Sequence, residues 1–69
     1  MFSNLKNELV KKDISVKQFG EFLGVSEKTA SNKLNGITEF TYGEFYKTCK
    51  FLFPEYNADF LFKRDDTAA

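Results

Sequence analysis

The sequence contains no histidine, and it has one cysteine and one proline among its 69 residues. Without histidine the chain lacks the commonest general base and the commonest metal ligand. The single cysteine, Cys49, cannot form an internal disulfide, and with no histidine to activate it we interpret it as a buried structural thiol. The composition therefore argues against an enzyme, a metal site or a bound cofactor.

Long hydrophobic runs are also missing. No stretch approaches the roughly 18 apolar residues that a transmembrane helix requires. The first twelve residues, MFSNLKNELVKK, intersperse charges with apolar residues, unlike a signal peptide. We therefore expect one small domain in a reducing cytoplasm, with no membrane partner and no small-molecule substrate.

The sequence also has no net charge, because ten basic residues balance ten acidic ones. DNA-binding domains usually carry a basic excess, since much of their affinity comes from neutralising phosphates. The balance is uneven along the chain: residues 1–36 carry a net charge of +2 and residues 37–69 a net charge of −2. The N-terminal half is therefore the better candidate for contact with an acidic partner.

The apolar residues that are present follow helical spacing. Ser3 is expected to cap a first helix that buries Leu5 and Leu9 and ends near Lys12 or Asp13. Short connections and the absence of repeats indicate a compact helical bundle. We expect five helices, no strand, and a single domain over residues 1–64, with residues 65–69 as a frayed tail.

Two further helices are expected after residue 40. Thr41 with Glu44 three residues later forms a capping box, which begins a fourth helix with an inward stripe of Phe45, Cys49, Leu52 and Phe53. Pro54 ends this helix. Asn57 then caps a short last helix.

The stretch from Ser15 to Gly36 is the most informative part of the chain. Ser15 and Ser26 are placed to cap two successive helices that are joined by the turn Gly24-Val25-Ser26. Gly20 leaves room for the second helix to cross the first, and Gly24 permits a positive φ in the turn. This pattern predicts a helix-turn-helix, in which the second helix can lie in the DNA major groove.

The same stretch resembles the lambda-repressor/Cro-like (Xre) family, and most closely small regulators of temperate phages. The shared features are Gly20, Gly24 with the following Val-Ser pair, Ala30, and the ending Leu34-Asn35-Gly36. The resemblance implies an all-α, five-helix lambda-repressor-like domain with its helix-turn-helix at residues 15–36. One position departs from the family pattern, because Val16 stands where a phosphate-contacting glutamine is usual.

The resemblance also implies which residues contact DNA. The second helix of the motif, with Ala30 and Leu34 facing inward, would direct five residues toward base edges: Glu27, Lys28, Thr29, Ser31 and Asn32. Six residues would contact phosphates: Lys17, Gln18, Lys33, Asn35, Thr38 and Thr41. The alternative for these residues is an ordinary solvated helix surface.

The aromatic residues exceed what one small core needs, and they concentrate after residue 45. We predict a candidate partner surface from five of them: Tyr46, Phe51, Phe53, Tyr56 and Phe62. The alternative is that the last helix folds back and buries most of them.

The resemblance implies a sequence-specific transcriptional regulator in a lysogeny–lysis switch, which binds a double-stranded operator through residues 27–35 and forms a homodimer on DNA. Such a protein would act at the nucleoid of a bacterial host. A second hypothesis is an antirepressor that uses the same fold to inactivate a phage repressor protein. Zero net charge, Val16, and the acidic residues Glu27 and Glu39 favour this second hypothesis.

Overall fold

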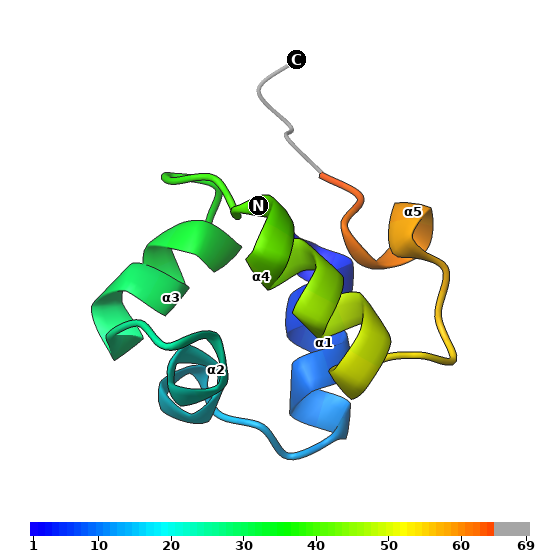
Figure 1. Ribbon diagram of the computed structural model, residues 1–69, viewed down its shortest axis with the longest axis horizontal. Helices are drawn as coiled ribbons and strands as arrows, with labels where there is room; N and C mark the ends of the chain where they lie inside the picture. The colour runs from blue at the N-terminus through cyan, green and yellow to red at the C-terminus, as the bar shows by residue number, and fades with distance from the viewer. Residues whose placement is uncertain (65–69) are drawn as a thin grey trace.

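The computed structural model describes residues 1–64, and these residues form helices and connecting loops with no strand among them. The helices run in the order α1 (Ser3–Lys11), α2 (Val16–Leu23), α3 (Glu27–Leu34), α4 (Tyr42–Lys47), η1 (Thr48–Leu52) and α5 (Ala58–Leu61). Figure 1 shows α4 in front of α1, with α2 and α3 on one side and α5 on the other. The predicted all-helical class is therefore confirmed for this part of the chain. The predicted tail, residues 65–69, lies outside the described residues.

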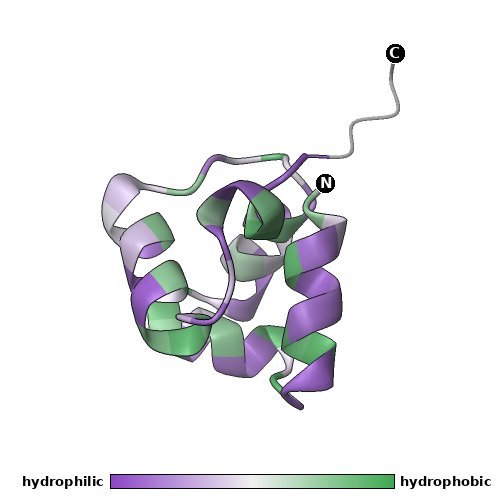
Figure 2. Cartoon of the chain, turned by 90° about the vertical axis from the view of Figure 1, so that its right-hand side faces the viewer, coloured by the Kyte–Doolittle hydropathy of each residue, from purple (hydrophilic) through white to green (hydrophobic). Residues whose placement is uncertain are grey.

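Helix α1 packs against elements from the middle and the end of the chain. Its Leu5 and Leu9 are buried, and the helix contacts both α3 and α5. Hydrophobic and hydrophilic residues alternate along the helices in Figure 2, as expected where one face of each helix lies in the core. The core is completed by residues of α2, α3 and α5 and by two residues that flank helices: Phe2, Phe19, Leu23, Ala30, Leu34, Phe53 and Leu61.

The helix N-termini follow the sequence prediction with one exception. Capping boxes are present at Ser15 and Thr41, and the side chain of Ser26 accepts a hydrogen bond from the Thr29 amide. The exception is Ser3, which is the first residue inside α1, so the predicted cap was wrong. Phe2 takes the N-cap position because its ring is buried and its amide donates to the carbonyl oxygen of Leu34 at 3.0 Å.

The fourth helix differs from its predicted regular form. After Lys47 the α-helix widens into the π-helical segment η1, in which Thr48 is fully buried and donates its hydroxyl to the carbonyl oxygen of Glu44 at 2.8 Å. Phe53 is also fully buried, whereas Phe45 and Cys49 are half-buried. Phe53 belongs to the core and Cys49 and Leu52 pack against it, in agreement with the predicted inward stripe, whereas Phe45 packs against Phe62.

Candidate nucleic-acid interface

Helices α2 and α3 pack closely against each other across a sharp turn. Gly24 ends α2 in the left-handed conformation, with φ +83°, and its amide donates to the carbonyl oxygens of Gly20 and Glu21. A Cβ added at Gly20 would lie 3.0 Å from the carbonyl oxygen of Val25 and 3.1 Å from that of Ser26. Glycine at position 20 is therefore what allows the turn to lie against α2.

The structure brings the five predicted base-reading residues onto the outer side of α3. Glu27 and Lys28 are exposed, whereas Thr29, Ser31 and Asn32 are half-buried. Ala30 and Leu34 are buried beneath them, as predicted. Glu27 and Lys28, in the first turn of α3, are the most accessible members of this face.

Part of this face is already hydrogen-bonded within the protein. The hydroxyl of Ser26 donates to Thr29 Oγ1 at 3.0 Å, and Asn35 Nδ2 donates to Ser31 Oγ at 3.4 Å. The carbonyl oxygen of Asn32 accepts the amide of Ile37 at 2.9 Å. The two side-chain bonds hold Thr29 and Ser31 in place, which reduces the entropy lost when these side chains bind a partner. The bond at Asn32 is made by its main chain.

Four of the predicted phosphate-contacting residues are exposed near the two ends of the α2–α3 pair: Lys17, Gln18, Asn35 and Thr38. Thr41 is exposed as well, at the start of α4. Gln18 and Thr41 also serve their capping boxes, since Gln18 Oε1 accepts the Ser15 amide and Thr41 Oγ1 accepts the Glu44 amide. Lys17 is the one cation in this exposed group.

Lys33 must be removed from the phosphate-contacting set. Its side chain is 9% exposed, and its Nζ forms an ion pair with Glu44 at 2.9 Å. The same Nζ donates to the carbonyl oxygen of Glu39 at 3.0 Å and lies 5.9 Å from the centre of the Phe40 ring. Lys33 therefore joins α3 to α4 inside the fold. The prediction of a phosphate contact was wrong because a lysine in the last turn of a helix is normally solvated, whereas this one is buried.

The structure places a different cation, Lys6, beside the end of α3. Lys6 Nζ donates to Asn35 Oδ1 at 3.5 Å, across 29 positions of sequence. The local pattern gave no indication of this contact, because Lys6 lies on α1, outside the motif. The exposed or half-exposed cations near α2 and α3 thus include Lys6, Lys17 and Lys28, and the acids Glu21, Glu27 and Glu39 are exposed in the same region.

Val16 lies at the edge of a small apolar hollow. The hollow has a volume of about 70 Å³ and is lined by Lys6, Leu9, Val10, Ile14, Val16 and Leu34. Val10 in this group is 74% exposed. An apolar surface at the start of α2 is unusual beside a phosphate backbone, since it gains nothing from contact with charged oxygens.

The five aromatic residues of the predicted partner surface differ in their exposure to solvent. Tyr46 and Phe51 are exposed, Tyr56 and Phe62 are half-buried, and Phe53 is fully buried. Phe53 was therefore wrongly assigned to an exposed surface, and its burial agrees instead with its predicted place on the inward stripe of the fourth helix.

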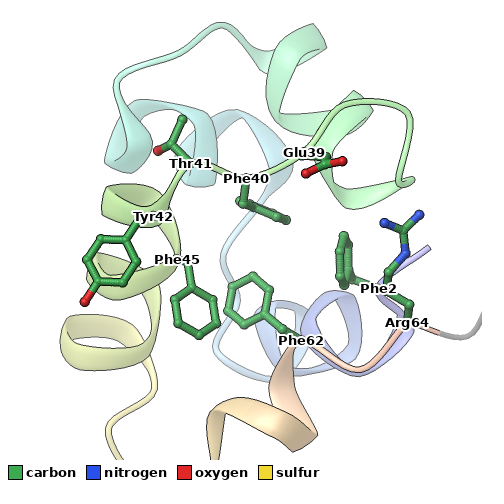
Figure 3. Close-up of a pocket in the computed structure, with 8 residues that line it drawn as sticks. All are labelled: Phe2, Glu39, Phe40, Thr41, Tyr42, Phe45, Phe62 and Arg64. Carbon is green, nitrogen blue, oxygen red and sulfur yellow. The ribbon is translucent and has the colours of Figure 1, made fainter.

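Phe62 instead belongs to an aromatic pocket of about 350 Å³ between the start of α1, the α3–α4 loop, α4 and the end of α5. In Figure 3 four rings gather around this space, those of Phe2, Phe40, Phe45 and Phe62, with Glu39 and Arg64 at its edge. The rings meet one another at centroid distances of 4.8 to 5.8 Å, mostly edge to face. Their mutual contacts hold the C-terminal end of the described chain against the α3–α4 loop.

Among residues 1–64, no group of three or more histidine, cysteine, aspartate or glutamate side chains is arranged to hold a metal ion. Burial raises the pKa of the Cys49 thiol, which disfavours a nucleophilic thiolate. Within the same residues, none of the helices has the length and apolar character to cross a membrane.

Comparisons with protein-family models, curated proteins and solved structures found no match to this chain.

Proposed function

We propose that the protein is a DNA-binding transcriptional regulator of the lambda-repressor/Cro type and that α3 is its reading helix. The observation that carries this proposal is the α2–α3 pair, in which close contact at Gly20 and a left-handed Gly24 leave the first turn of α3 exposed. Both helices have eight residues and capped N-termini. This geometry suits a helix that enters the major groove with its N-terminal residues toward the bases.

In this proposal the side chains have separate roles. Lys28 donates to guanine O6 or N7, Asn32 pairs with adenine, and Glu27 accepts from cytosine N4. Lys17 and Lys6 neutralise phosphates on either side of the groove. Occupancy of an operator by this domain would block or recruit polymerase in a phage lysogeny–lysis switch, within the cytoplasm of a bacterial host.

The second candidate is an antirepressor that docks on a repressor protein. Specific observations favour it: Lys33 is unavailable to phosphate, Glu27 and Glu39 are exposed, and Val16 borders an apolar hollow. Exposed acidic side chains complement a basic protein surface better than they complement DNA.

The test is a titration of short duplexes that differ in sequence, at several salt concentrations, with binding followed by fluorescence anisotropy. With about three cations at the interface, the slope of log K against log salt should be about −2 to −3. Lys28→Ala and Asn32→Ala should each relax discrimination at one base pair by about 1–3 kcal/mol. Lys17→Ala should weaken all duplexes alike and reduce the salt slope by about 1.

Lys47→Ala is the matched control, because Lys47 Nζ donates to the carbonyl oxygen of Phe22 and lies over its ring, so this cation is already engaged within the fold. Its salt slope should equal that of the unaltered protein. Unchanged binding in all three interface variants would remove α3 as the reading helix. If no duplex binds even at low salt, the antirepressor becomes the better candidate, and Glu27→Lys should then weaken the complex with the repressor.

A further inference from the structure

The aromatic pocket between α1, the α3–α4 loop, α4 and the end of α5 has the size and lining of a site for a small ligand. Its volume is about 350 Å³, and half-buried Phe40, Phe45 and Phe62 line it together with buried Phe2. Ligand sites are typically concave and mostly apolar, carry a few well-placed polar groups, and begin at about 300 Å³. A pocket near this lower limit suits a ligand with one ring system. Its residues come from the start, the middle and the end of the described chain, so no local motif predicts it.

Two side chains of opposite charge stand at the edge of this pocket. Glu39 and Arg64 are both exposed, and Figure 3 shows them on the Phe2 side of the rings. The guanidinium carbon of Arg64 lies 5.4 Å from the centre of the Phe2 ring, which keeps this cation beside the pocket. The carbonyl oxygen of Glu39 accepts from Lys33 Nζ, whereas its carboxylate forms no ion pair within residues 1–64. The edge therefore offers both an anion and a cation to a ligand whose apolar part lies among the rings.

The charges already present decide which class of ligand fits. Lys33 Nζ lies 5.9 Å from the centre of the Phe40 ring, and Arg64 lies against Phe2. A ligand that is only cationic would meet these two positive charges, and a ligand that is only anionic would meet the Glu39 carboxylate. A ligand that carries both charges next to an aromatic ring complements the edge and the rings together.

We propose that the pocket binds a free aromatic α-amino acid. The ring of the ligand packs among the phenylalanine rings, which favour a further edge-to-face contact. Its ammonium group donates to the Glu39 carboxylate. Its carboxylate accepts from Arg64, whose five N–H donors can serve this acceptor beside the contacts that the residue already has. The two charged groups of an amino acid are attached to one carbon, so they reach two side chains on the same side of the pocket.

The test is an amide NMR titration of the full chain with L-phenylalanine and with L-tryptophan, from about 0.05 to 10 mM. Saturable shifts should centre on Phe40, Thr41 and Phe62. The expected dissociation constant is about 0.1–2 mM, because so small a ligand at a partly exposed site gains limited affinity. No saturable shift with either amino acid would overturn the proposal, as would saturable shifts confined to other parts of the chain.

Three related compounds each remove one part of the ligand. Leucine lacks the ring, phenylalanine amide lacks the carboxylate, and N-acetylphenylalanine lacks the ammonium group. Each should bind at least about fivefold more weakly than phenylalanine. Leucine that binds equally well would contradict an aromatic ligand. Either derivative binding equally well would contradict a free amino acid and would indicate the end of a peptide instead.

Two substitutions at the edge of the pocket assign the charged contacts. Glu39→Gln and Arg64→Gln should each weaken phenylalanine binding at least about fivefold. Glu39→Gln should not weaken N-acetylphenylalanine, and Arg64→Gln should not weaken phenylalanine amide, because those compounds lack the group that each side chain holds. Glu27→Gln is the matched control, since it removes an exposed acid from α3, and its phenylalanine binding should be unchanged.

Phenylalanine binding that both edge variants leave intact would overturn the proposal. These measurements use the protein without DNA, and the proposal does not rest on DNA binding. Ligand binding and DNA binding can therefore each fail without the other.

Discussion

At the scale of single residues, the most consequential contact is the ion pair between Lys33 and Glu44. It joins the end of α3 to α4, and Lys33 also holds the carbonyl oxygen of Glu39. Glu44 accepts the amide of Thr41 in addition, which completes the capping box. One nearly buried cation thus fixes both ends of the α3–α4 loop, where Thr38 and Thr41 are candidates for phosphate contact.

We expect Lys33→Met to lower the free energy of unfolding by about 2–4 kcal/mol, because it leaves the Glu44 carboxylate in a poorly solvated site without its cation. Urea denaturation at pH 7 measures this change. Lys28→Met, which removes an exposed cation from the same helix, should change stability by less than about 0.5 kcal/mol. Equal effects of the two substitutions on the free energy of unfolding would show that the ion pair does not stabilise the fold.

At the scale of secondary-structure elements, two helical glycines have opposite surroundings. Gly20 in α2 lies against the backbone of the turn, whereas Gly43 in α4 faces open space. Replacing each glycine by alanine therefore distinguishes the two roles. The effect at Gly20 reports close packing, and the effect at Gly43 reports the helix propensity of the residue.

Gly20→Ala should destabilise the protein by about 1–3 kcal/mol, because backbone carbonyl oxygens cannot move away as a flexible side chain would. Gly43→Ala should instead stabilise it by up to about 1 kcal/mol. Thermal unfolding of each variant beside the unaltered protein measures both effects. A stabilising Gly20→Ala would mean that α2 and the turn are not in close contact.

At the scale of the whole molecule, three carboxylates connect elements and have lowered pKa values. A hydrogen bond from Tyr56, followed by Lys11, lowers the pKa of Glu8. Burial opposes ionisation of Glu44, but hydrogen bonds from Lys33 and Thr41 outweigh it and lower the pKa. Hydrogen bonds from its own backbone amide and from Lys12 lower the pKa of Glu55.

A carboxylate with a lower pKa in the folded protein stabilises the fold above its unfolded pKa, and this stabilisation is lost as the pH falls through the folded value. We therefore expect a constant urea midpoint between about pH 7 and pH 5, followed by a fall below about pH 4.5. Glu44→Gln should reduce the fall of the urea midpoint at acidic pH, because one of the three carboxylates is removed. A midpoint that rises on acidification would contradict these assignments.

The sequence by itself determined the helical class, the caps at Ser15, Ser26, Thr41 and Asn57, and the left-handed turn at Gly24, where φ is +83°. These features depend on residues within four positions of one another, so local hydrogen bonding and backbone sterics are enough to predict them. The outward positions of Glu27 and Lys28 followed from the buried Ala30 and Leu34 in the same way.

Only the tertiary structure decided which polar and aromatic side chains remain available. Lys33 is buried because Glu44, eleven residues later, meets it across a loop, and Lys6 reaches Asn35 from another helix. Phe62 is half-buried because it meets Phe2, Phe40 and Phe45 from other parts of the chain, while Tyr42 on α4 remains exposed. Such outcomes depend on how separate helices fill one core, and the periodicity of a single helix carries no information about its neighbours.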